Sequence, residues 1–210
     1  MSLLGFDESI ALMKRYGVRV PEFELAKGAD EAARLAAKLG YPVALKVASE
    51  KIIHKSDVGG VKLNLRDAAE VRRAYGDIAH AVGKANSGRM LVQKMAPGGV
   101  ELIVGGKQDA QFGPVLAFGI GGIFVEVFKD VSLRICPIDK VEAKKMMHEI
   151  KGYPILKGMR GMKPVDEEAL AELLVSVSKL MAENDVKELD LNPVIAYAHG
   201  YVAVDARVIS

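Results

Sequence analysis

The sequence predicts an α+β protein with two lobes, the larger of which carries an antiparallel sheet. Helical and strand-like hydrophobic periodicities alternate over residues 1–88, whereas closely spaced short strands joined by tight turns open residues 89–210. Strands that follow one another after short turns pair in antiparallel fashion. Half of the 210 residues are hydrophobic and 27% are charged, a composition that can bury a core and argues against disorder.

The elements of the N-terminal lobe, residues 1–88, follow from local signals. Gly17 and Gly40 are suited to end helices, and Asp67 is a suitable N-cap. A polar loop over residues 49–60 separates two strands. In chain order, we expect a helix over 7–17, a strand over 20–25, a helix over 30–40, strands over 42–48 and 61–65, and a helix over 67–82.

The elements of the C-terminal lobe, residues 89–210, follow the same reasoning. Turns rich in glycine, proline and aspartate separate the strands, and a stripe of leucine, valine and methionine marks the longest helix. Residues 151–164 have no clear periodicity and are expected to form an irregular loop. We expect strands over 90–95, 100–107, 114–119 and 131–136, helices over 140–150 and 166–184, and a hairpin of strands over 186–194 and 201–208.

Charge and composition exclude several classes of function. The 29 Lys and Arg residues against 27 Asp and Glu residues give a net charge of +2 without a basic run, which argues against a nucleic-acid binder. No apolar stretch reaches the roughly 18–20 residues that span a membrane. The N-terminus carries acidic residues where a signal peptide needs basic ones. The single cysteine, Cys136, excludes an intrachain disulfide. We therefore expect a cytoplasmic protein.

Lys46 is the first candidate for binding an anion. It is the single charge in the apolar strand 42–48, on the face that Ala44 and Ala48 share. A lysine there can contact a phosphate as a point charge. Alternatively, it is a lysine at a sheet edge whose ammonium reaches solvent.

The loop over residues 54–62, HKSDVGGVK, is the second candidate. Its glycines Gly59 and Gly60 allow backbone N–H groups to approach phosphate oxygens, and His54, Lys55 and Lys62 add positive or titratable groups. An ordinary polar hairpin loop is the alternative. The chain contains no GxxxxGK[ST] motif, and no GxGxxG follows a strand, so neither a Walker A loop nor a Rossmann site is supported.

The C-terminal hairpin suggests a metal site. In ELDLNP, polar residues alternate with leucines, so that Glu188, Asp190 and Asn192 share one strand face. If the turn centres on His199, Asn192 lies close to Asp205. A carboxylate and an amide oxygen together suit Mg²⁺ and leave room for water and phosphate. An exposed polar face is the alternative, although Asp205 sits in an apolar strand where burial without a partner is costly.

Three further charged residues occur between these motifs. Glu101 follows a Pro-Gly-Gly turn, and Glu126 and Arg134 flank the glycine-rich loop GIGGIF. Arg134 interrupts the apolar strand 131–136 as Lys46 interrupts its own strand. Each residue alone is compatible with a solvated charge. Together they add a second cation and further acidic groups to a cleft expected between the lobes.

This ordered set of motifs resembles the ATP-grasp superfamily over nearly the whole chain. More narrowly, it resembles the β subunit of ADP-forming acetyl-CoA (acyl-CoA) synthetases, which are related to the succinyl-CoA synthetase β chain. The matching segments are YPVALKV, HKSDVGGVKLNL, LVQKMAPGGVEL, GPVLAFGIGGIFVEVFKDVSLRICPI, ELDLNPV and AVDARV. The resemblance implies an ATP-grasp fold with a nucleotide cleft between two lobes.

The resemblance also assigns roles to individual residues. The residues that it implies for nucleotide binding are Lys46 and Arg134 at the phosphates, Gly59 and Gly60 in a loop over them, Gln93, Lys94 and Met95 whose backbone meets adenine, and Glu101 after them. Asn192 and Asp205 match the family's two Mg²⁺ ligands. His54 is implied to pass phosphate from a phosphohistidine to ADP, or to orient that phosphate without being phosphorylated itself. The implied catalytic residues are therefore His54, Lys46 and Arg134.

The resemblance implies an acid–thiol ligase that converts acyl-CoA, ADP and phosphate to a carboxylic acid, CoA and ATP, with ATP/ADP and Mg²⁺ as cofactors. In the relatives, CoA binding and the phosphohistidine reside on an α subunit or on another part of a fused chain. We therefore expect this chain to act only with a CoA-binding partner, as an α₂β₂ heterotetramer. The succinyl branch differs at His54-Lys55-Ser56, which favours the acetyl/acyl branch. Alternatives are an ATP-grasp carboxylate–amine ligase and a non-catalytic nucleotide-binding subunit.

Overall fold

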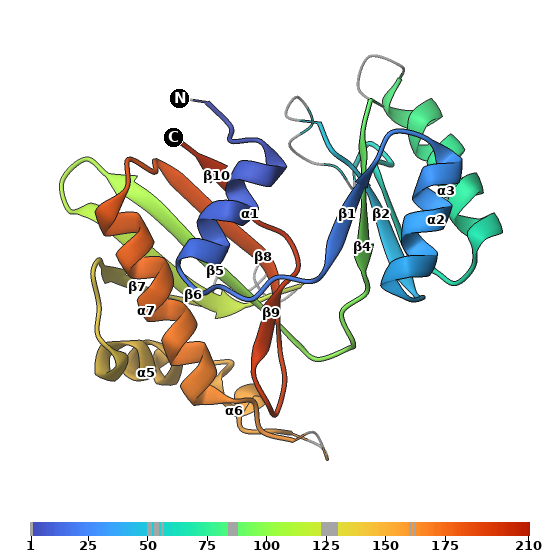
Figure 1. Cartoon of the computed structure of the whole chain (residues 1–210). Coiled ribbons are helices and arrows are strands. Elements are labelled where there is room, and N and C mark those ends of the chain that lie inside the picture. Colours follow the sequence, from blue (N-terminus) through green and yellow to red (C-terminus); the bar gives the residue numbers. More distant parts are fainter. Residues whose placement is uncertain are drawn as a thin grey trace. The chain divides into compact units, whose positions relative to one another are not determined.

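The computed structural model describes most of the chain, in several stretches. The chain folds into two compact units. The described residues are 2–49, 52, 55, 57–83, 88–122, 130–159, 161 and 163–210. One unit, called unit 2, comprises Pro21–Pro97, and the other, unit 1, comprises Met1–Val20 together with Gly98–Ser210. The elements of both units are labelled in Figure 1.

This division differs from the expected lobes 1–88 and 89–210. The first helix, α1 (Phe6–Arg15), belongs with the C-terminal part because it contacts the last strand, and Leu3 forms a bridge with Ile209. Strand β4 (Met90–Lys94) belongs with the N-terminal part because it pairs with two strands of that unit. Long-range pairing of the chain ends and of β4, rather than position in sequence, sets the boundary.

Unit 2 is a four-stranded antiparallel sheet with the order β1-β4-β2-β3 and two helices. Its other elements are β1 (Phe23–Ala26), α2 (Ala29–Leu39), β2 (Val43–Val47), β3 (Val61–Leu65) and α3 (Ala68–Val82). Helices α2 and α3 pack against each other and against the sheet, and Figure 1 shows them on the same face. Asp67 caps α3 as expected, accepting a hydrogen bond from the Glu70 amide. The unit has its own core of alanine, valine and leucine side chains.

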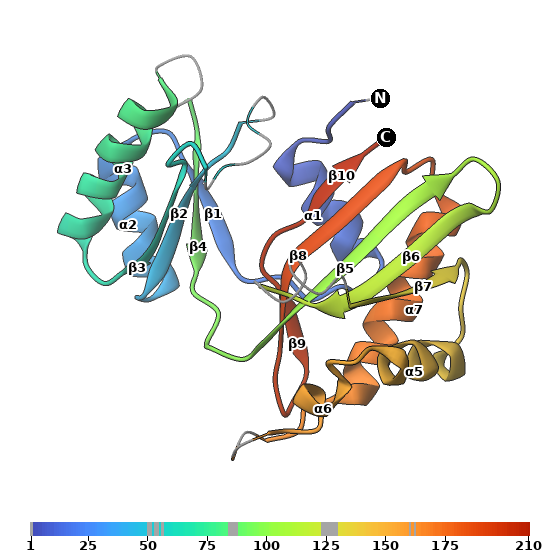
Figure 2. The same cartoon turned by 180° about the vertical axis from the view of Figure 1, so that it is seen from behind.

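Unit 1 is built on a larger antiparallel sheet with the order β10-β8-β5-β6-β7, and β9 pairs with β8. Its elements besides α1 are β5 (Val100–Asp109), β6 (Gly113–Ile120), β7 (Val131–Ile135), α5 (Lys140–Glu149), α6 (Tyr153–Leu156), α7 (Glu167–Glu183), β8 (Glu188–Ala196), β9 (Tyr201–Ala203) and β10 (Arg207–Ile209). Figure 2 shows the sheet from the side opposite to Figure 1. The α+β class and the antiparallel sheet of the larger part are confirmed.

One face of the unit 1 sheet is buried by helices. Helix α7 packs on β5 and β6, and α5 packs on β6 and β7. Gly106 lets α7 approach closely on this face, because a Cβ there would lie 2.5 Å from the Met181 Sδ and the methionine side chain would have to move. Side chains alternate along each strand, so neighbours of Gly106 such as Gly105 and Lys107 point to the opposite face. That second face carries the site residues of unit 1 described below, apart from Arg134, which contacts α5.

Two expected elements differ in the structure. Residues 151–164 contain the short helix α6, which Pro154 can start because its missing N–H lies in the first turn. The strand expected over 201–208 is divided into β9 and β10. The Val204 amide donates to the Pro193 carbonyl, but Pro193 has no N–H to return a bond, so the ladder is interrupted there. Within the described stretches, the helices are too short or too polar to cross a membrane.

Candidate functional site

Lys46 lies in the interior of the unit 2 sheet. Strand β2 runs between β3 and β4, with Lys46 opposite Val61 on one side and Leu91 on the other. All five residues of β2 are buried, and only 4% of Lys46 is exposed. The alternative of a lysine at a sheet edge is therefore wrong. A lysine at this depth is held in one position, and a ligand phosphate is one of the groups that its ammonium can bind.

The glycine pair is fixed next to the end of β2. The Gly60 amide donates to the Lys55 carbonyl over 2.7 Å, and its carbonyl accepts from the Val47 amide over 2.8 Å. Gly59 has φ of +71°, a conformation that favours glycine. The end of the loop is thus held beside the strand that carries Lys46. His54, the residue expected to handle phosphate, lies outside the described residues.

Gly60 offers a test of this loop, because a Cβ there would lie 2.8 Å from Val47 Cγ1 and 2.9 Å from the Lys55 carbonyl oxygen. We expect Gly60→Ala to displace the loop and to lower the free energy of unfolding by roughly 1–3 kcal/mol. Denaturant unfolding measures the loss. Gly76→Ala is the control: Gly76 lies in α3 with nothing near its Cβ position, so this change is expected to be neutral or stabilising. Equal stability of the two variants would contradict the prediction.

Residues 93–95 lie at the end of β4. Gln93 is 1% exposed and pairs with Ala44 of β2, whereas the Lys94 side chain is exposed. The Lys94 amide donates to the Glu22 carbonyl and the Met95 amide to the Pro42 carbonyl, over 2.9 and 3.1 Å. These two N–H groups already have acceptors within unit 2. The expected contact of Lys94 and Met95 with adenine stays a prediction, and it would have to use groups other than these two N–H groups, such as the backbone carbonyl oxygens.

Glu101, near the start of β5, lies next to the first glycines after β6, which come much later in the sequence. Its carbonyl accepts a hydrogen bond from the Gly121 amide over 2.7 Å, and a Cβ on Gly122 would lie 3.5 Å from Glu101 Oε2. The Glu101 side chain itself is exposed on β5. The structure thus brings this carboxylate to the first glycines after β6. Glu126, the other acidic candidate of this segment, lies outside the described residues.

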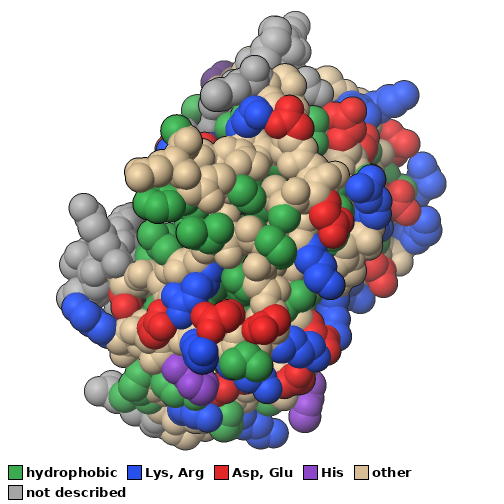
Figure 3. Space-filling model, turned by 90° about the vertical axis from the view of Figure 1, so that its left-hand side faces the viewer, with side chains coloured by type: hydrophobic (Ala, Val, Ile, Leu, Met, Phe, Trp, Pro, Cys, Tyr) green, Lys and Arg blue, Asp and Glu red, His purple; other side chains and the backbone are tan. Residues whose placement is uncertain are grey.

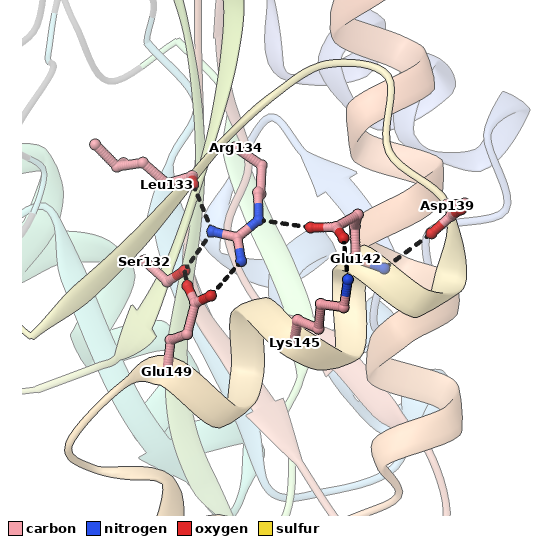
Figure 4. Close-up of polar contacts among 7 residues, drawn as sticks. All are labelled: Ser132, Leu133, Arg134, Asp139, Glu142, Lys145 and Glu149. Carbon is pink, nitrogen blue, oxygen red and sulfur yellow. Dashed lines mark hydrogen bonds and ion pairs between the residues drawn. The ribbon is translucent and has the colours of Figure 1, made fainter.

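Arg134 lies on the helix-covered face of the unit 1 sheet, where α5 binds its guanidinium (Figure 4). Nε donates to Glu142 Oε2 over 3.1 Å, and a terminal nitrogen donates to Glu149 Oε1 over 2.6 Å. The other terminal nitrogen donates to the Leu133 carbonyl and the Ser132 hydroxyl. The side chain is 20% exposed. These contacts give Arg134 a role in attaching α5 to β7, and the expected contact with nucleotide phosphates stays a prediction.

Replacing Arg134 separates the two roles. The guanidinium holds the pKa of the Glu149 carboxyl below its ordinary value, and the pKa of Glu142 is lowered first by Lys145 and then by Arg134. We expect Arg134→Met to lower the free energy of unfolding at pH 7 by roughly 1–3 kcal/mol. A carboxyl group whose pKa is lowered in the folded protein stabilises the fold at pH values above its ordinary pKa. The difference in stability between wild type and variant should therefore shrink as the pH falls below about 4. Thermal unfolding across pH measures the difference.

The same Arg134→Met variant tests nucleotide binding. A side chain that only attaches α5 predicts an unchanged dissociation constant for ATP. A large loss of ATP affinity at unchanged stability would instead support phosphate contact. Lys179→Met, at an exposed lysine of α7, controls for the removal of one positive charge from unit 1.

Asn192 and Asp205 face each other, as expected from the hairpin. Asp190 pairs with Arg207, and Val194 pairs with Ala203. The register is the same on both sides of the interruption, so Asn192 lies opposite Asp205. Asn192 is exposed and Asp205 is half-buried. The two residues therefore offer an amide oxygen and a carboxylate toward the same region, which is a donor set suited to Mg²⁺.

Asp190 is a third polar residue on this face of β8, and the sequence pattern did not single it out as a ligand. Burial raises the pKa of the Asp190 carboxyl above its ordinary value. Arg207 opposes this rise, while the charges of Asp205 and Glu188 add to it. The signal was present in the sequence, since Asp190 and Asn192 are two residues apart on one strand.

The predicted residues thus form separate groups within each unit. In unit 2, Lys46, Gly60 and Gln93 lie on or beside β2. In unit 1, Asn192 lies opposite Asp205, and Glu101 contacts the glycine-rich segment. Arg134 is on the face of the sheet that α5 covers. The described residues include no cluster of three or more His, Cys, Asp or Glu side chains arranged to hold a metal by themselves.

Comparison with known proteins relates this geometry to a family. The family model described as an ATP-grasp domain matches residues 1–209. The β subunit of acetate–CoA ligase (ADP-forming) I from Pyrococcus furiosus is 47% identical over 207 residues, which are 96% of this chain and 89% of that subunit. The similarity therefore extends over almost the full length of both chains.

Solved structures show the same similarity. Dinucleotide forming acetyl-coenzyme A synthetase 1 of Ca. Korarchaeum cryptofilum, in complex with coenzyme A, Ca-AMPCP and HgCl⁺, has a TM-score of 0.94 at 46% identity over 99% of this chain and 93% of that one. The same synthetase with coenzyme A and Mg-AMPPCP, its phosphohistidine segment pointing towards the nucleotide binding site, has a TM-score of 0.87 at 44% identity over 99% and 92%.

Proposed function

Because the chain belongs to the ATP-grasp family, we propose that it is the nucleotide-binding β subunit of an ADP-forming acetyl-CoA or acyl-CoA synthetase. The reaction converts acyl-CoA, ADP and phosphate to a carboxylic acid, CoA and ATP, and it is reversible. The observation that carries this proposal is the end-to-end similarity to a β subunit of an ADP-forming acetate–CoA ligase. The placement of the predicted residues in unit 1 and unit 2 supports it.

In the proposed reaction, phosphate reaches ADP from a phosphohistidine of the partner. The P–N bond of the phosphohistidine breaks, and a P–O bond to the terminal phosphate of ADP forms. Such a transfer depends mainly on positioning and on stabilising charge. Lys46 supplies a buried cation in unit 2, and the backbone of Gly59 and Gly60 supplies a loop that can approach phosphate oxygens.

The acidic residues of unit 1 suit the metal that accompanies nucleotides. Asn192 and Asp205 would hold Mg²⁺, since an amide oxygen and a carboxylate are oxygen donors that leave coordination positions for water and phosphate. When bound there, the ion would neutralise phosphate charge. Glu101 is proposed to bind the nucleotide beside the glycine-rich segment.

The partner is proposed to be a CoA-binding subunit with the phosphohistidine, in an α₂β₂ complex. The relative from Pyrococcus furiosus is named as a β subunit, which supports a partner on a separate chain. Co-purification from the native host tests this proposal. We expect a CoA-binding chain to accompany the protein, and the complex to make ATP from acetyl-CoA, ADP and phosphate.

Two results would overturn the proposed function. One is turnover by the isolated chain with an amine acceptor, which indicates a carboxylate–amine ligase. The other is ATP binding without phosphoryl transfer in the complex, which indicates a non-catalytic subunit.

The same complex distinguishes the two roles of His54. Acid-labile phosphate on a peptide that contains His54 supports a relay, and the absence of this phosphate during turnover supports orientation of the incoming phosphate.

A further inference from the structure

The open face of the unit 1 sheet, which the helices do not cover, contains a groove that has no role in the function proposed above. Its volume is about 800 Å³. The groove follows two rows of residues across the strands. The first row is Leu133, Ala117, Gly105 and Asp190, and the second is Ile135, Val115, Lys107 and Glu188, each residue pairing with the next.

The groove is hollow because its centre lacks large side chains. Gly105 and Ala117 are cross-strand partners in the first row, and a Cβ on Gly105 would lie only 3.8 Å from the Ala117 Cβ. The larger side chains of Leu133 and Ile135 border this floor on the β7 side. Two neighbouring small residues at the middle of a sheet thus leave a channel between the β7 side and the β8 side.

The β7 side of the groove is apolar and exposed. Leu133 is 59% exposed, and Ile135 and Phe112 are each 56% exposed. Figure 3 shows hydrophobic side chains gathered on one face of the molecule, bordered by a band of charged side chains. Strand β7 exposes Leu133 and Ile135, while Ser132 and Arg134 contact Glu149 of α5. The polar side of this strand is therefore the covered one, the reverse of a strand whose hydrophobic side is buried. Such a concentration of exposed apolar side chains is typical of a contact surface.

The β8 side of the groove leads to the proposed metal ligands. Asp190 lines it and lies two residues before Asn192 on the same face of β8. Asp205 in turn lies opposite Asn192. The groove therefore runs from an apolar ledge, defined as Phe112, Leu133 and Ile135, to Asp190, beside the residues at which phosphate is expected to arrive.

We propose that this groove is the docking surface for the segment of the CoA-binding partner that carries the phosphohistidine. This inference rests on the proposed function, and it adds the surface that receives the partner. The segment must bring its histidine to the Asn192 and Asp205 end, so it must lie along a surface continuous with that end. An extended segment with apolar side chains fits the channel, because the ledge offers hydrophobic contact and the Gly105 and Ala117 floor leaves room for it.

The double variant Leu133→Thr with Ile135→Thr tests the docking surface. Threonine keeps the β-branched shape that strands favour and removes apolar contact. We expect single-turnover transfer of phosphate from ATP to the histidine of the co-purified partner to slow by about tenfold or more, a change of 1.4 kcal/mol per factor of ten. The dissociation constant for ATP and the melting temperature should not change.

Val141→Thr is the matched control, since Val141 is an exposed apolar residue of α5 that does not line the groove. It should transfer phosphate at the wild-type rate. Phe112→Ser, at the turn between β5 and β6, repeats the test away from β7, so that a folding defect of the double variant does not decide the outcome.

Three results would overturn the docking proposal. The first is wild-type transfer by the double variant and by Phe112→Ser. The second is self-association through the groove. In that case the wild-type chain sediments as a dimer, whereas the double variant sediments as a monomer and still transfers phosphate at the wild-type rate. The third is a wild-type complex that never phosphorylates a partner histidine, which identifies a failure of the proposed function itself.

Discussion

Asp205→Asn is expected to reduce ATP synthesis from acetyl-CoA, ADP and phosphate by the complex roughly 100-fold or more. The substitution removes the carboxylate that faces Asn192 and keeps the size of the side chain. Its amide oxygen can still accept the hydrogen bond that the Ala206 amide donates to Asp205 over 3.1 Å, so the fold should persist. Rates measured across Mg²⁺ concentrations should show a higher half-saturating concentration as well as a lower maximum.

Asp185→Asn is the matched control for Asp205→Asn. Asp185 is an exposed carboxylate of the same unit that pairs with Lys187, and its loss should leave both the rate and the Mg²⁺ dependence unchanged. A wild-type rate and wild-type Mg²⁺ dependence in Asp205→Asn would show that this carboxylate does not hold the metal.

Lys46→Met is expected to weaken ATP binding by the chain about 10- to 100-fold, the loss expected from one charge-assisted contact. Methionine fills a similar volume and suits a buried strand, so stability should be kept or increased. Isothermal titration with Mg·ATP measures affinity, and denaturant unfolding measures stability. Lys46→Arg is not expected to restore binding, because a planar guanidinium does not replace a compact ammonium in a fully buried position.

Lys38→Met serves as the control for Lys46→Met. Lys38 is an exposed lysine of unit 2 whose ammonium pairs with Glu24 over 2.7 Å, so its removal changes the net charge equally. If Lys46→Met bound ATP as tightly as Lys38→Met, Lys46 would have no part in nucleotide binding, and its burial would be purely structural.

The Asn192–Asp205 pair could be predicted from the sequence because it depends on one local turn. Two strands joined by a short turn have their register set by that turn, so alternation along ELDLNP and the position of His199 were enough. The capping of α3 by Asp67 and of α7 by Asp166 was likewise set by neighbouring residues.

The environment of Lys46 and the role of Arg134 could not be predicted in this way. Alternation places Lys46 on one face of β2 but does not say whether β2 lies inside the sheet or at its edge. Strand β4, which makes it internal, comes more than forty residues later in the chain. Arg134 interrupts its strand as Lys46 does, yet its partners come from α5, and that packing gives it a different role.

The sequence by itself determined the order of most helices and strands, the antiparallel pairing of the C-terminal strands, and the motifs that indicate the family. These depend on local periodicity, caps and turns. Only the tertiary structure decided which face of each strand the helices cover, which chain ends join which unit, and that β7 presents Leu133 and Ile135 outward. A period of two residues divides a strand into two faces, but the elements that pack against it, distant in sequence, decide which face is buried.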